Sequence, residues 1–154
     1  MDLDLTLTAE SQEKWTALKN KEIRYVILKT DSEQKEVQLD SFGERDATFE
    51  DFKNAMPKDE PRWALYEAFI EREDGSTANK IIMVHYSPDD YFGPLKFFFA
   101  TAKQKVETFF LGLNKTWQVS NCPHTFRSMI TMISNGRRSL RCSLNQDNSF
   151  SWFA

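Results

Sequence analysis

Apolar positions recur along this chain at two spacings, and each spacing indicates a different kind of element. Apolar residues three and four positions apart, which share one face of a helix, occur at about 9–20, 48–56, 94–110 and 123–133. Alternating or continuous apolar runs rich in β-branched and aromatic residues indicate strands at 22–30, 35–41, 62–71, 80–87 and 115–120. The predicted order of elements is therefore α-β-β-α-β-β-α-β-α.

Local signals mark the limits of several of these elements. Thr48 with Asp51 resembles a capping box, in which a threonine and an acidic residue bond each other's backbone at the start of a helix. Pro57 ends this helix, because the residue before a proline disfavours the helical conformation. An Asp-Gly pair within 72–77 predicts a tight turn between two strands.

The combination of hairpins with interspersed helices predicts the fold class. The strand at 80–87 is apolar almost throughout, which is typical of a central strand buried on both faces. We therefore predict an α/β sandwich whose central mixed β-sheet is flanked by helices on both faces. A chain of 154 residues has the size of one domain. We assign 1–134 to that domain and 135–154, where no apolar period is clear, to a loosely attached C-terminal tail.

The predicted helix at 94–110 holds more aromatic residues than one face can bury. Pro94 suits the first turn of a helix and not its interior, so the helix is expected to begin there. Its buried face is predicted to comprise Leu95, Phe98, Phe99, Ala102, Val106 and Phe109. On the other side lie Lys96, Phe97, Ala100, Lys103, Gln104 and Glu107. Phe97 is thus the phenylalanine that we expect to face solvent or a partner.

Composition and charge narrow the class of protein. A formal net charge of −3 argues against a generic nucleic-acid binder, which is usually basic. Cys122 and Cys142 form no disulfide framework and lack the spacing of a metal site. The acidic first residues are unlike a secretory signal, and no apolar run approaches the roughly 20 residues of a membrane span. We expect a cytoplasmic protein.

Signatures of catalysis or of a bound cofactor are absent from the sequence. The five glycines are scattered, and none belongs to a phosphate-binding loop. His85 lies in an apolar strand and is expected to be a hydrogen-bonded core residue, whereas His124 is expected at the surface. Asp89 and Asp90 precede the long helix, where negative charge favours the helix N-terminus. We predict no enzymatic activity, no cofactor and no metal.

Four strings, in order and at matching spacing, resemble the actin-depolymerising factor/cofilin family. "IRYVILK" (23–29) resembles its first strand, and "MPKDEPRWALYEAFIE" (56–71) resembles its Leu-Pro…Arg-Tyr-Ala segment. "KIIMVHYSPDD" (80–90) resembles the strand that ends in Trp-x-Pro-Asp/Glu, with Tyr86 in place of the tryptophan. "LKFFFATAK" (95–103) resembles the motif Lys-Met-x-Tyr-Ala-Ser-Ser-Lys without a gap. The resemblance covers residues 10 to about 133 and implies the fold of the actin-depolymerising-factor homology domain, a gelsolin-like sandwich.

The resemblance implies a partner and a site. In the family the long helix enters a cleft of an actin subunit, where an apolar knob fills the cleft and flanking cations meet an acidic surface. The residues that match this site are Pro94, Lys96, Phe97, Thr101, Lys103 and, outside the helix, Lys80. A phosphoinositide contact through Lys96, Lys103 and Lys105 is a further expectation. The resemblance thus implies a monomeric protein that associates with the actin cytoskeleton and regulates the turnover of actin filaments.

Departures from the family pattern leave an alternative open. Pro94 stands where the family usually has a cation, Ala78 replaces another cation, and the regulatory N-terminal serine has no match. These departures predict that filament binding and severing are weaker than monomer binding. The motifs "PRW" (61–63) and "EDGS" (73–76) also resemble the glia maturation factor branch, which implies binding to the actin branch complex with little direct actin binding.

Overall fold

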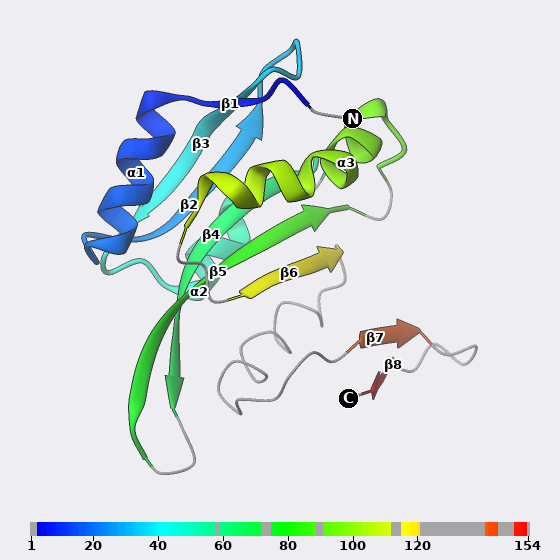
Figure 1. Cartoon of the computed structure of the whole chain (residues 1–154). Coiled ribbons are helices and arrows are strands. Elements are labelled where there is room, and N and C mark those ends of the chain that lie inside the picture. The colour runs from blue at the N-terminus through cyan, green and yellow to red at the C-terminus, as the bar shows by residue number, and fades with distance from the viewer. Residues whose placement is uncertain are drawn as a thin grey trace.

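The computed structural model of the chain describes residues 3–57, 59–71, 75–88, 91–111, 115–120, 141–144 and 150–153. The helices in these ranges are α1 (Ala9–Lys19), α2 (Phe49–Ala55) and α3 (Pro94–Phe109), as labelled in Figure 1. The strands are β1 (Thr6–Leu7), β2 (Ile23–Thr30), β3 (Glu36–Glu44), β4 (Arg62–Glu71), β5 (Thr77–Ser87), β6 (Lys115–Ser120), β7 (Arg141–Leu144) and β8 (Phe150–Phe153).

Six strands form one mixed sheet in the order β1-β3-β2-β4-β5-β6. The inner pairs are antiparallel, whereas β1 pairs parallel with β3 and β5 pairs parallel with β6. Parallel neighbours need a crossover connection, and α3 is the helix between β5 and β6. The crossover therefore lays α3 across one face of the sheet.

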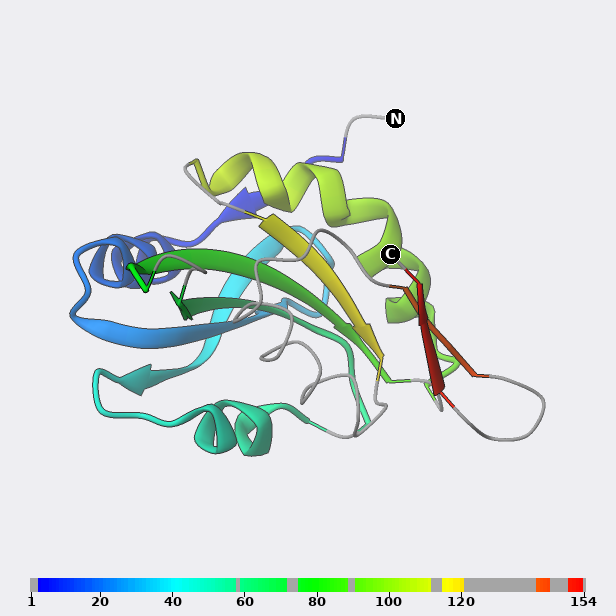
Figure 2. The ribbon, with the colours of Figure 1, turned by 90° about the horizontal axis from the view of Figure 1, so that it is seen from below.

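One face of the sheet packs against α1 and α3, which lie on the same side in Figure 2. Strands β2, β4 and β5 alternate, so Val26, Leu65 and Met83 point to this face. The helices meet each other as well, since the ring centroids of Trp15 in α1 and Phe110 after α3 lie 5.3 Å apart. This layer is the larger of the two cores.

The opposite face packs against α2, which Figure 2 shows on the other side of the sheet. Phe52 is fully buried there, with its ring centroid 5.3 Å from that of Tyr25 and 4.9 Å from that of Tyr66. The reciprocal capping box of Thr48 and Asp51 is present at the start of α2. The prediction of a central mixed sheet with helices on both faces is confirmed.

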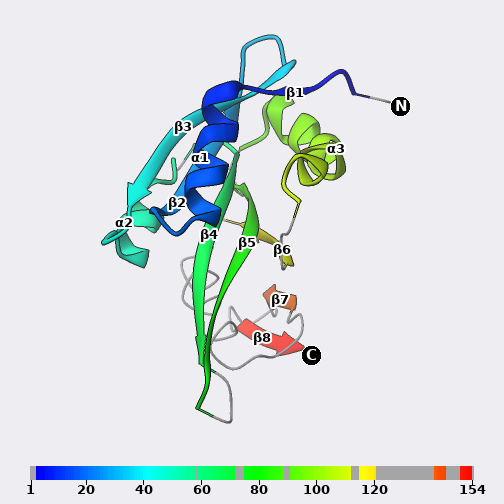
Figure 3. The ribbon, with the colours of Figure 1, turned by 60° about the vertical axis from the view of Figure 1, so that its left-hand side comes forward.

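The paired strands β4 and β5 form a long hairpin that projects past the rest of the sheet (Figure 3). The two strands pair from Arg62 with Tyr86 to Glu71 with Thr77. Strand β2 pairs with β4 only at 63–66, and β6 pairs with β5 only at 82–87. The far half of the hairpin is therefore a two-stranded ribbon.

Several elements differ from the sequence prediction. Strand β1 had no local signal, because two residues become a strand only through pairing with Glu36 and Val37. Strand β3 continues to Glu44, three residues beyond its predicted end, since its last residues pair with β2. The predicted tail at 135–154 contains the antiparallel pair β7 and β8, which form a separate two-stranded sheet. The predicted helix at 123–133 lies outside the described residues.

Candidate functional site

Helix α3 is fixed on the sheet by its apolar side. Phe98, Phe99, Ala102 and Val106 are buried in the core, and the ring of Phe99 stacks on that of Trp63 with centroids 3.9 Å apart. Leu95 and Phe109 pack against the same cluster. The predicted buried face is confirmed, and it determines which residues of α3 remain for a partner.

An exposed strip runs along the outer side of α3. Phe97 is 79% exposed, as the sequence predicted, and Ala100, Thr101 and Gln104 are exposed with it. The hydroxyl of Thr101 donates a hydrogen bond to the carbonyl oxygen of Phe97 at 2.9 Å, one turn earlier. Phe97 is therefore a large apolar side chain on a rigid helix with its ring in solvent.

The helix begins at the predicted proline. Gly93 is the N-cap and makes no side-chain cap hydrogen bond, and exposed Pro94 occupies the first turn. A proline fits there because the first backbone N–H groups of a helix have no intrahelical acceptor. Asp89 and Asp90, which were expected to favour this helix end by charge, lie outside the described residues.

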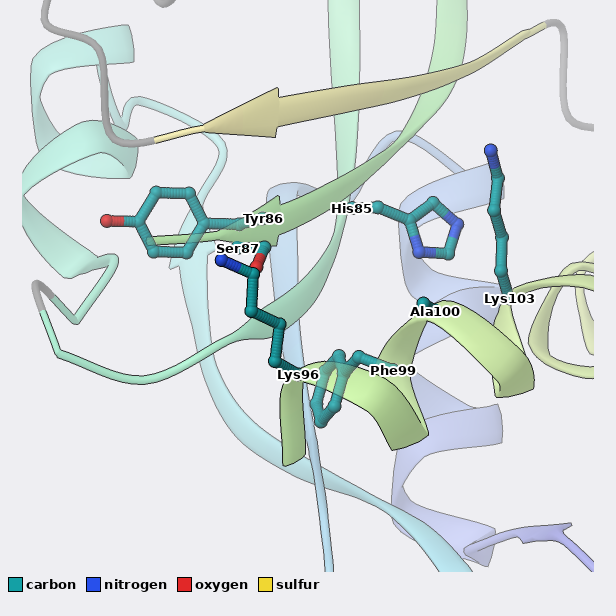
Figure 4. Close-up of a pocket in the computed structure, with 7 residues that line it drawn as sticks. All are labelled: His85, Tyr86, Ser87, Lys96, Phe99, Ala100 and Lys103. Atoms are coloured by element: carbon teal, nitrogen blue, oxygen red, sulfur yellow. The ribbon is translucent and has the colours of Figure 1, made fainter. Parts of the chain in front are cut away.

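Lys96 and Lys103 lie on one flank of α3 rather than beside Phe97 on the exposed strip. Both line a cavity of about 170 Å³ between α3 and β5, together with His85, Tyr86, Ser87, Phe99 and Ala100 (Figure 4). At roughly 100° per residue, Lys103 lies about a third of a turn around the helix from Phe97. The two lysines therefore flank the apolar knob on the side of β5. The cavity is well below the roughly 300 Å³ at which small-molecule pockets begin.

His85 is buried at the base of this cavity. Burial, with a smaller contribution from the charge of Lys103, lowers the pKa of His85 from 6.5 to about 4, so its imidazole is neutral at pH 7. Its Nε2 lies 3.7 Å from Oε1 of Glu107 and has no hydrogen-bond partner among the described residues. The prediction of a core histidine is confirmed. The expectation that it is fully hydrogen-bonded is wrong for Nε2, because no donor or acceptor of α3 comes close enough.

The structure does not bring the remaining predicted cations to this flank. Lys105 is nine residues after Lys96, which places it on the opposite side of α3. Lys80 lies in β5 on the same face as Ile82 and Val84, the face away from α3. Its backbone pairs with Ala68 in the projecting hairpin. His124 lies outside the described residues.

Two features of the structure were not anticipated from the sequence. Phe92 is 87% exposed directly before α3, and the Nζ atom of Lys96 lies 5.3 Å from the centroid of its ring. Glu67 is a buried carboxylate that accepts hydrogen bonds from Arg45 and, at 2.7 Å, from Nδ2 of Asn79. The position of Phe92 beside Gly93-Pro94, before the predicted start of the helix, could have indicated that its side chain is exposed. The contacts of Glu67 could not be predicted, because its partners are distant in the sequence.

Other kinds of site find no support in the part of the chain that the structure describes. No group of three or more His, Cys, Asp or Glu side chains there could hold a metal ion. No helix within the described ranges is long and apolar enough to cross a membrane.

Comparison with known proteins places these observations in a family. The model of the family described as cofilin/tropomyosin-type actin-binding protein matches residues 4–124. Actin-depolymerizing factor 8 of Arabidopsis thaliana is 28% identical over 113 residues, which is 73% of this chain and 81% of the relative.

Solved structures show the same architecture. Actin depolymerization factor 2 of Plasmodium berghei superposes with a TM-score of 0.74 at 18% identity, over 86% of this chain and 98% of that structure. Glia maturation factor of Caenorhabditis elegans gives a TM-score of 0.61 at 19% identity, over 78% of this chain and 90% of that structure. At these identities the likeness concerns the fold alone.

Proposed function

Since this chain belongs to the family of cofilin/tropomyosin-type actin-binding proteins, we propose that it binds actin through α3 and regulates the turnover of actin filaments. The observation that carries the proposal is Phe97, a large apolar side chain 79% exposed on a helix that is otherwise anchored in the core. The string "LKFFFATAK", which resembles the actin-binding motif of the family, contains this residue.

The exposed strip of α3 fits an apolar cleft with an acidic rim. Burying the ring of Phe97 against a partner would contribute roughly 1.5–3 kcal/mol. Lys96 and Lys103 on the flank would meet acidic residues at the rim, which accelerates association and fixes orientation more than it adds affinity. The helix is already folded and packed, so little conformational entropy is lost when the partner binds.

Binding to actin subunits would also account for filament disassembly. A protein that binds free subunits more tightly than filament subunits shifts the polymerisation equilibrium toward monomers by mass action. We propose that the protein binds actin monomers more strongly than filaments and that it severs filaments only weakly. Pro94 stands where the family usually has a cation at the start of α3. Lys80 lies on the face of the sheet away from α3, so α3 and the part of β5 around Lys80 do not form one basic surface.

A double variant, Lys96→Ala/Phe97→Ala, tests the site. We expect it to lose most binding to actin monomers and most cosedimentation with filaments while keeping its thermal stability, because neither side chain belongs to the buried core. Asn54→Ala, an exposed polar change in α2 on the opposite face of the sheet, is the matched control and should bind as wild type does. Unchanged binding by the double variant would contradict the site, and a wild-type protein without actin binding would contradict the function.

The absence of a cation at residue 94 also favours a second candidate function, in which the chain binds the actin branch complex and has little affinity for actin itself. The fold is compatible with this alternative, since glia maturation factor has it as well. Pull-down with purified branch complex in the absence of actin distinguishes the two. Retention of branch complex by a chain that does not bind actin monomers would favour the alternative.

We further propose that the protein acts as a cytoplasmic monomer without enzymatic activity. A phosphoinositide could compete with actin for Lys96 and Lys103, because both lysines lie on one flank of α3. Lys105 on the opposite side of the helix would contribute little to the same contact. Vesicles with and without phosphoinositide, at low and high salt, test this addition, and binding should weaken as salt rises.

A further inference from the structure

The start of α3 carries more exposed apolar surface than the proposed actin contact uses. Among the described residues, the large apolar side chains that are most exposed are Phe92 at 87%, Leu111 at 80% and Phe97 at 79%. Phe92 and Phe97, which we call the aromatic pair, both belong to the first turn of α3 and its approach, whereas Leu111 follows the other end of the helix. Two exposed phenylalanines so close in the chain are unusual for a solvent-facing surface.

The aromatic pair occupies positions that often contact each other. With Gly93 as N-cap, Phe92 is the residue before the cap and Phe97 is the fourth helical residue, the two positions of a hydrophobic staple. The staple is not closed here. Both rings are largely exposed to solvent, so neither covers the other. The pair therefore does not serve to fix the entry of the chain into the helix.

Phe92 contacts Lys96 and not the residue with which it would close a staple. The Nζ atom of Lys96 lies over the ring of Phe92, 5.3 Å from the centroid, within the range of a cation–π interaction. Because Lys96 lies on a helix anchored in the core, this contact favours a position of the Phe92 ring near the start of α3. An exposed ring that is oriented before binding loses less conformational freedom when a partner covers it.

We propose that Phe92 is a second aromatic contact for actin beside Phe97, and that Lys96 is the residue that positions it. This inference rests on the proposed function. The surface is continuous with the proposed site, since Lys96 contacts Phe92 and is the chain neighbour of Phe97. A cation over one exposed ring, on the flank of the helix that carries the other, is complementary to an apolar cleft with an acidic rim, the chemistry proposed for the actin partner.

Substitution of Phe92 tests the proposal with purified actin monomers. We expect Phe92→Ala to raise the Kd by roughly tenfold, as for a residue near the centre of an interface. The Kd of Phe92→Leu should lie between those of wild type and Phe92→Ala, because leucine keeps apolar area and lacks the ring. Leu111→Ala, an equally exposed apolar truncation at the other end of α3, is the matched control and should bind as wild type does.

A double-mutant cycle tests the positioning role of Lys96. Lys96→Met keeps the aliphatic stem and removes the charge that lies over the ring. If Lys96 acts partly through Phe92, the loss caused by Lys96→Met should be smaller in the Phe92→Ala background than in wild type. Additive losses would overturn the positioning role, even if Phe92 itself contacts actin.

The outcomes separate this proposal from the proposed function. Wild-type affinity in Phe92→Ala, combined with weak binding by Phe97→Ala, would overturn the inference and leave the function intact. No actin binding by wild type would overturn both. Sedimentation equilibrium and vesicle binding of wild type and Phe92→Ala complete the test. A Phe92-dependent dimer or vesicle complex, with unchanged actin affinity, would assign the aromatic pair to a second copy of the chain or to a membrane and overturn the inference.

Discussion

Phe97 and Phe99 have the same side chain and lie only two residues apart, yet one is exposed and the other is buried. Phe99 is buried and stacks on Trp63, whereas the ring of Phe97 is in solvent. The difference follows from helix geometry, because two residues correspond to roughly 200° around the axis. Neighbouring aromatic residues on α3 can therefore serve stability and binding separately.

Truncating each phenylalanine should separate these roles. Phe99→Ala is expected to lower the free energy of unfolding by about 3–5 kcal/mol, since it leaves a cavity beside Trp63. Phe97→Ala should change it by less than about 0.5 kcal/mol, because an exposed residue makes few contacts. Urea unfolding followed by tryptophan fluorescence measures both. Equal destabilisation by the two variants would contradict the assignment of the faces of α3.

His85 should make stability depend on pH. Its pKa is lowered to about 4 in the folded state, first by burial and then by Lys103, against 6.5 for an exposed histidine. The unfolded chain therefore binds a proton more readily, and stability is lost as pH falls from about 6.5 toward 4. At pH 4.5 the loss from this group is roughly 2–3 kcal/mol relative to pH 7.5.

The variant His85→Gln isolates this contribution. Carboxylates also change stability at low pH, so the informative quantity is the difference between wild type and variant in urea unfolding at pH 7.5 and pH 4.5. The variant should lose less stability over this interval. Parallel losses would show that His85 titrates alike in the folded and unfolded chain. Glu107, 3.7 Å away, would be the reason to examine next.

At the scale of elements, α2 is a short helix whose N-terminus is capped by side-chain hydrogen bonds. The hydroxyl of Thr48 accepts from the backbone N–H of Asp51 at 3.2 Å, and the carboxylate of Asp51 accepts from that of Thr48 at 2.8 Å. A helix this short is marginal by itself, so the cap and the burial of Phe52 and Met56 must hold it on the sheet.

Removing the cap should destabilise this layer. Thr48→Ala is expected to lower the free energy of unfolding by about 1 kcal/mol, because one N-terminal amide loses its acceptor. Thr48→Ser keeps the hydroxyl and should recover most of the loss. Thermal unfolding by circular dichroism measures both variants. A serine variant as unstable as the alanine variant would mean that the methyl group, and not the cap, stabilises α2.

The elements that could be predicted from the sequence are those with a local cause. The period of α3, its start at Pro94 and the doubly buried β5 all follow from side-chain pattern and backbone preference. Strand β1 could not be predicted, since its two residues are extended only because β3 pairs with them. Strands β7 and β8 likewise depend on their mutual pairing, and four residues each are too few to show a clear apolar period.

The candidate site was predictable to a similar degree. The exposure of Phe97 follows from helical period, and so does the separation of Lys105 from Lys96. Phe92 could not be placed in this way, because it precedes the helix and no period applies to it. The position of Lys80 on the far face depended on the register of β5, which the sequence leaves open by one residue.

At the scale of the whole molecule, the mixed sheet joins two cores that share the same strands. Strands β2, β4 and β5 send alternate side chains to the layer of α1 and α3 and to the layer of α2. A partner that binds the outer side of α3 therefore contacts an element supported by the larger core. The projecting half of the β4–β5 hairpin lies beyond both layers (Figure 1).

The parallel pairing of β5 and β6 has a consequence for biosynthesis. Strand β6 covers the edge of β5 at 82–87, but residues 88–114 must be synthesised before it emerges from the ribosome. Until then β5 is an apolar edge strand with unpaired backbone groups, which is a template for aggregation. A chain that stopped after α3 would keep this edge permanently. Nascent chains arrested between β5 and β6 should therefore depend on chaperones, and completion of β6 should release them.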